Sequence, residues 1–107
     1  MKFPFFKGKA NKGVQKDFPF YDPPNVATIT CCHVMDGDRP ILYVSHDADD
    51  GTWQFLCGEP HSNEEALVVA LEEVFELDPS VGELKDMPLG CYATRENKES
   101  TWTVMRK

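Results

Sequence analysis

Short runs of apolar and β-branched residues alternate with turn-forming residues over much of the chain. From Asn25 the sequence reads Val-Ala-Thr-Ile-Thr-Cys-Cys-His-Val, which favours a first strand. Turn-forming residues at 36–40 and 47–51 separate this run from Ile41–His46 and Thr52–Gly58. Three strands joined by two short turns predict an antiparallel meander.

One stretch has the apolar spacing of a helix. Ser62 stands three residues before Glu65, which is the spacing of a capping box. The sequence therefore predicts a helix over 63–77. The expected apolar face consists of Leu67, Val68, Leu71, Val74 and Phe75.

The last third of the chain predicts a short helical turn and a hairpin. Asp78 followed by Pro79 fits the cap and the first position of a helical turn. The runs Cys91–Arg95 and Trp102–Arg106 flank the polar residues 96–100. Together these elements predict an α+β fold with an antiparallel sheet in the order βββαββ, packed on one face by a single main helix.

The first 24 residues differ in composition from the rest. They interleave aromatic residues with prolines and lysines, which predicts an extended N-terminal arm rather than a helix. Residues 25–107 are long enough to form a single α+β domain with one core. The second face of its sheet is expected to be partly hydrophobic, and the arm or a second copy in a homodimer could cover it.

Charge is divided between these two parts. Residues 1–16 carry five lysines and no acidic residue, whereas residues 17–107 hold all eighteen acidic residues against six basic ones. The net charge of −7 disfavours nucleic acid and anionic membranes as partners of the body and favours a basic protein.

The start of the chain and its cysteines indicate a compartment. Met-Lys-Phe-Pro-Phe-Phe-Lys lacks the apolar stretch of a signal peptide, and no run approaches the roughly 18 apolar residues of a membrane span. We expect a cytoplasmic protein whose four cysteines stay reduced.

Acidic residues form two groups that suit a cationic partner. In a helix over 63–77, three glutamates fall in the C-terminal half, where the helix dipole disfavours negative charge. Local stability does not explain that pattern, so we interpret it as a surface for a basic protein. The expected contact residues are Glu72, Glu73 and Glu76 on the helix, with Asp47, Asp49 and Asp50 in the second turn.

A metal site is the main alternative. Cys57 and His61 have the Cys-x3-His spacing of two zinc ligands, with Cys31 or Cys32 and His33 as further candidates. The predicted meander argues against a full site, because it places Cys31 four residues along the sheet from Cys57, about 13 Å away. We therefore expect no bound metal and no cofactor.

Common catalytic motifs are absent from the sequence. It contains no Gly-x-Ser-x-Gly, no phosphate-binding glycine loop and no His-Glu-x-x-His. His33 and His46 are expected to have structural roles, and a pairing of His33 with Cys31 or Cys57 is the one conceivable dyad. These observations favour a non-catalytic protein.

Three segments resemble small uncharacterised bacterial proteins. These are Asp50-Gly51-Thr52-Trp53-Gln54-Phe55-Leu56-Cys57-Gly58, Asp78-Pro79-Ser80 and Met87-Pro88-Leu89-Gly90-Cys91-Tyr92-Ala93-Thr94-Arg95. The similarity covers residues 41 to 106 and implies no active site. In size and acidity alone the chain is also similar to immunity proteins that neutralise bacterial toxins.

The favoured function is thus a small acidic cytoplasmic protein that binds another protein, with an immunity-like or regulatory role. The alternative is a metal- or thiol-dependent enzyme or sensor that uses Cys57, His61 and His33.

Overall fold

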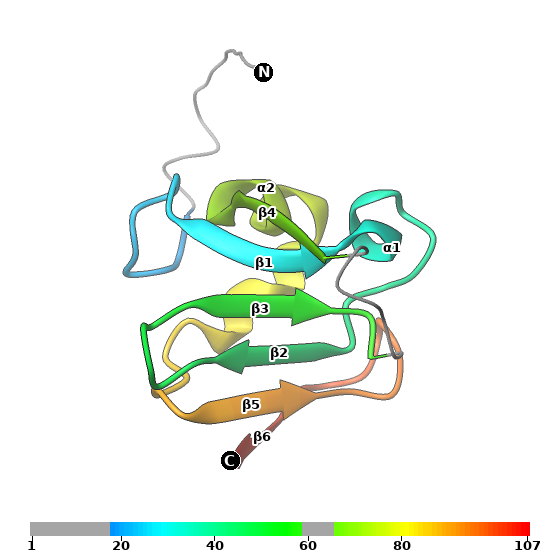
Figure 1. The fold of residues 1–107 in the computed structure, drawn as a ribbon. Helices are drawn as coiled ribbons and strands as arrows, with labels where there is room; N and C mark the ends of the chain where they lie inside the picture. Colours follow the sequence, from blue (N-terminus) through cyan, green and yellow to red (C-terminus); the bar gives the residue numbers. More distant parts are fainter. Residues whose placement is uncertain (1–17, 59–65) are drawn as a thin grey trace.

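A mixed six-stranded sheet with short helices forms the domain (Figure 1). The structure is a computed structural model and describes residues 18–58 and 66–107. In chain order the elements are β1 (Ala27–Cys31), α1 (Cys32–Met35), β2 (Tyr43–His46), β3 (Trp53–Leu56), β4 (Ala66–Ala70), α2 (Leu71–Leu77), the 3-10 helix η4 (Pro79–Leu84), β5 (Cys91–Thr94) and β6 (Thr103–Arg106). The α+β class is confirmed.

The strand order differs from the predicted meander. The sheet has the order β4-β1-β3-β2-β5-β6, so β3 lies between β1 and β2. β1 runs parallel to β3, whereas the other neighbouring pairs are antiparallel. The prediction of an entirely antiparallel sheet was wrong because the first run ends at Cys31. Residues 32–35 turn into α1 and carry the chain past β3 before it returns as β2.

The prediction of a helix over 63–77 was wrong for residues 66–70. Ala66–Ala70 is a strand that pairs with β1 over five residue pairs, and the helix begins only at Leu71. Two adjacent β-branched residues, Val68 and Val69, favour this extended backbone. The predicted capping box at Ser62 and Glu65 lies outside the described residues.

The core face of the sheet is shifted by one residue from the predicted register. His46 pairs with Trp53 and Val44 with Phe55, whereas symmetric turns in the predicted meander would place Ser45 beside Trp53. A slip of one residue moves every side chain of a strand to the opposite face. Trp53 and Phe55 are both buried in this register. Helical residues complete the core, namely Leu71, Val74, Val81 and Leu84.

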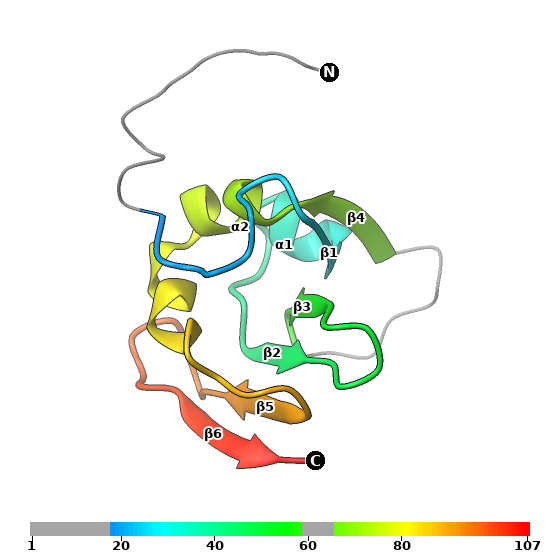
Figure 2. The same ribbon diagram turned by 90° about the vertical axis from the view of Figure 1, so that its left-hand side faces the viewer.

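The described end of the predicted arm packs against this core. Residues 18–26 lie on the same side of the sheet as α2 and η4 (Figure 2). Phe20 is only 6% exposed, and its ring centroid lies 5.2 Å from that of Trp53. A Cβ atom at Gly82 would lie 2.8 Å from Pro19 Cγ, so this segment needs a glycine on η4. Packed structure therefore extends at least to Phe18, which contacts Phe20.

Arg95 joins two of the segments that carry the resemblance. Its guanidinium donates hydrogen bonds to Asp78 Oδ2 at 2.8 Å and to Ser80 Oγ at 2.9 Å. Asp78 also accepts a hydrogen bond from the Ser80 backbone, which confirms the predicted Asp-Pro cap. These motif residues thus have a structural role. Within residues 18–58 and 66–107, no helix is long and apolar enough to cross a membrane.

Candidate metal centre

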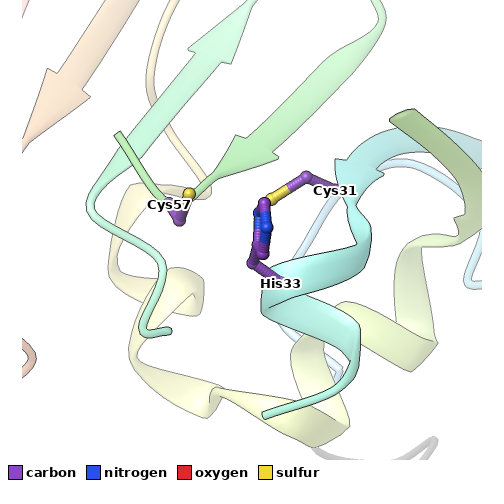
Figure 3. A group of neighbouring side chains, drawn as sticks. All are labelled: Cys31, His33 and Cys57. Atoms are coloured by element: carbon purple, nitrogen blue, oxygen red, sulfur yellow. The ribbon is translucent and has the colours of Figure 1, made fainter. Parts of the chain in front are cut away.

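Two cysteines and one histidine meet at one edge of the sheet. Cys31 is the last residue of β1, and Cys57 directly follows β3. Because β1 and β3 are parallel, their carboxyl ends lie at the same edge (Figure 1). His33 projects from α1 toward the two thiols (Figure 3). The sulfur atoms of Cys31 and Cys57 and one ring nitrogen of His33 lie within 4.8 Å of one another.

This convergence contradicts the separation expected from the predicted meander. The antiparallel meander placed Cys31 and Cys57 about 13 Å apart, since it ran β1 against β2. In the structure Thr30 pairs with Phe55, which places Cys31 opposite Leu56 and one position away from Cys57. The expected separation of Cys31 from Cys57 was therefore wrong.

Local backbone structure fixes the positions of His33 and Arg39. The His33 carbonyl accepts hydrogen bonds from the Asp38 and Arg39 amides at 3.0 and 3.2 Å, which folds the loop after α1 back on itself. This turn places the Arg39 Nη1 atom 4.0 Å from Cys57 Sγ. A positive charge therefore lies beside one sulfur of the centre.

The two thiols are almost completely buried. Cys31 and Cys57 are 1% and 2% exposed, and His33 is partly exposed. Burial raises the pKa of the Cys31 thiol, and the adjacent Cys57 side chain contributes to the rise. A metal ion that binds there has to displace this proton, as is general for thiolate ligands.

The donor atoms suit a thiophilic divalent ion. In a tetrahedral zinc site with Zn–S bonds near 2.3 Å, neighbouring donor atoms lie roughly 3.5 to 3.8 Å apart. The three atoms lie within 4.8 Å, so they must approach by at most about 1 Å, which side-chain rotation can supply. Two sulfurs and an imidazole select zinc over magnesium or calcium. Arg39 would donate to a zinc-bound Cys57 sulfur and stabilise its negative charge.

A half-open pocket adjoins this centre. It has a volume of about 390 Å³ and lies between α1, the following loop, the end of α2 and Lys98. Val34, which follows His33, and Arg39 are part of its wall. Arg39 thus contacts both the pocket and Cys57.

The other predicted metal and histidine candidates do not join the group. His61 lies outside the described residues. His46 stacks on Trp53 with ring centroids 3.9 Å apart, and its Nδ1 donates to the Met87 carbonyl at 2.8 Å, a structural role. Cys32 and Cys91 are not members of the group either.

Two of the three helical glutamates lie at the start of the helix and not in its C-terminal half, where they were predicted. Glu72 and Glu73 occupy the first turn of α2, because the helix starts at Leu71. Negative charge is favourable there, and Glu73 accepts a hydrogen bond from the Ala70 amide at 3.0 Å. The expected conflict with the helix dipole therefore does not exist for these two residues. Glu76 is exposed near the helix end.

In the acidic turn, residues 47–51, Asp47 forms hydrogen bonds and an ion pair within the chain. Asp47 accepts hydrogen bonds from Ser45 Oγ and Gln54 Nε2 and pairs with Lys107 at 3.3 Å. Burial opposes ionisation of Asp47, but these hydrogen bonds and the lysine charge hold its pKa below the usual value. Asp49 and Asp50 are exposed. A hydrogen bond from the Thr52 amide holds the pKa of Asp50 low.

Comparison of the chain with protein-family models, curated proteins and solved structures gives no match. The centre is therefore interpreted from its geometry. The Cys-x-His spacing of Cys31 and His33 at the end of a strand is the sequence signal that could have identified Cys31 as a candidate ligand.

Proposed function

We propose that this protein binds Zn²⁺ reversibly through Cys31, His33 and Cys57. The convergence of the three donor atoms within 4.8 Å carries this proposal. Two thiolates neutralise the charge of the ion, and burial of both sulfurs shields the bonds from competing water.

Reversible binding fits the rest of the structure better than a purely structural zinc. Structural sites have four protein ligands, whereas the described residues supply three. Within the described residues, these three ligands leave the fourth tetrahedral position to another donor, which suits a metal-responsive protein.

Elemental analysis of protein purified without chelator tests this proposal. We expect about one zinc per chain, and we expect cobalt substitution to give thiolate-to-metal charge-transfer absorption. The variants Cys31→Ser, His33→Ala and Cys57→Ser should lose most of the zinc. Cys32→Ser is the matched control, because Cys32 has the same chemistry but lies outside the group. Wild-type protein that takes up no zinc or cobalt would refute the proposal.

A second proposal is association with a basic protein, as the charge of the chain suggests. β4 is an edge strand of the sheet, and its Val68 side chain is 73% exposed. The acidic start of α2 follows β4 directly. An edge strand offers unpaired backbone groups to a partner strand, and Glu72 and Glu76 would attract its basic residues.

Charge reversal tests this second proposal. A Glu72→Lys/Glu76→Lys variant should capture less of any partner recovered from a host extract and should associate with it more slowly at low salt. Glu96→Lys/Glu99→Lys, in the turn before β6, is the control. Equal association rates for the two variants would exclude this surface. Glu73 stays unchanged because it caps α2.

A further inference from the structure

The thiols of Cys31 and Cys57 lie close enough to each other to form a disulfide after oxidation. Both cysteines are reduced and buried. Cys31 ends β1 and Cys57 directly follows β3, and these two strands are parallel neighbours. Strands lie about 4.8 Å apart and rise about 3.3 Å per residue, so residues one step apart on adjacent strands have Cα atoms roughly 6 Å apart. Disulfides span Cα distances of about 4.4 to 6.8 Å. The sulfur atoms already lie within 4.8 Å of each other, and side-chain rotation has to close the remaining gap to an S–S bond of about 2.05 Å.

We infer that Cys31 and Cys57 form an intrachain disulfide when the protein meets a peroxide. The bridge itself requires no metal. Its consequence for zinc, described below, rests on the proposed function.

The reaction balances with hydrogen peroxide as the two-electron oxidant. One sulfur attacks a peroxide oxygen, the O–O bond breaks, and the departing hydroxide leaves as water with the thiol proton. The resulting sulfenic acid is attacked by the second sulfur, the S–O bond breaks, and a second water leaves. Two thiols are oxidised to one disulfide, and one peroxide is reduced to two waters.

The other two cysteines are less well placed. Cys91 begins β5, which is separated from β3 by β2, so its backbone lies roughly 10 Å from β3. Cys32 lies in α1, and its sulfur is not part of the converging group. Oxidation is therefore expected to select one pair among four thiols.

The bridge and a zinc ion exclude each other. The disulfide consumes both sulfur donors and leaves His33 as the one remaining ligand of the described group. Oxidation should therefore release zinc. In return, bound zinc holds both sulfurs and should protect them from peroxide.

Oxidation of metal-free protein tests the bridge. Titration with a thiol reagent should fall from four thiols to two after peroxide treatment. Peptide mapping should identify a Cys31–Cys57 link that dithiothreitol reverses. Cys32→Ser should fall from three thiols to one, whereas Cys57→Ser should form no intrachain link. Four persistent thiols, or a link that involves Cys32 or Cys91, would overturn the inference.

The same treatment of zinc-loaded protein tests the exclusion. We expect bridge formation to slow roughly tenfold or more, with one zinc released per bridge formed. Equal rates with and without bound zinc would overturn the exclusion. A bridge in a protein that binds no zinc would refute the proposed function and leave the disulfide standing. Zinc binding by a protein that forms no bridge in its metal-free state would overturn the disulfide and leave the proposed function standing.

Discussion

Removal of the Arg95 side chain should destabilise the protein more than most single substitutions. The Arg95 side chain is 1% exposed and pairs with Asp78 Oδ2 at 2.8 Å. It also donates to the Ile41 carbonyl at 2.9 Å, to Ser80 Oγ at 2.9 Å and to the Lys98 carbonyl at 3.3 Å. Four acceptors from three chain segments therefore depend on one guanidinium.

Arg95→Met keeps much of the volume and removes all of these donors. Loss of one partner of a buried ion pair costs about 3 to 5 kcal/mol, because the other charge stays behind without compensation. Asp78 is 20% exposed, so water relieves part of that cost and the lower end of the range applies. Since small domains are stable by only about 5 to 15 kcal/mol, the loss should be large in any unfolding curve.

Urea unfolding followed by tryptophan fluorescence measures this loss. The Trp102 ring lies 4.1 Å from the Arg95 guanidinium carbon, so the signal reports on the same region. Arg106→Met, on the exposed strand β6, should change the free energy of unfolding by less than about 0.5 kcal/mol. A double-mutant cycle with Asp78→Asn should give a coupling energy of about 0.5 to 3 kcal/mol.

A loss below about 1 kcal/mol for Arg95→Met would refute the reasoning, since it would mean that water replaces the guanidinium at little cost. Zero coupling with Asp78→Asn would show that the ion pair is not the source of the effect.

Three further predictions concern other parts of the molecule. Gly82→Ala should lower the unfolding temperature, because the new Cβ atom would lie 2.8 Å from Pro19 Cγ, whereas Gly37→Ala would meet no such contact and should show only the cost of its positive φ. The folded-state pKa of Asp47 lies below its usual value of 3.8, so its stabilising effect is complete above that pH and is lost as the pH falls through the folded-state pKa. The difference in free energy of unfolding between wild type and Asp47→Asn should therefore be constant from pH 5 to 7 and shrink below about pH 4. Zinc at 100 times its dissociation constant should stabilise the wild type by about 2.7 kcal/mol and leave Cys57→Ser unchanged, which thermal unfolding with and without zinc can measure.

The sequence determined much of the local structure. The strands at 27–31, 43–46 and 53–56 and the final hairpin follow from β-branched runs and turn-forming residues close to them in the chain. The cap at Asp78 is equally local, because its acceptor and its donor are two residues apart.

The tertiary structure decided the rest. The run Ala66–Ala70 is apolar enough for either a helix or a strand, and the open edge of β1 selected the strand through backbone hydrogen bonds. The pairing of β1 with β3 is a contact between residues about 25 positions apart, and no turn between them specifies it. The centre of Cys31, His33 and Cys57 depends on that pairing, since thiols at the ends of two strands meet only when the strands run in the same direction.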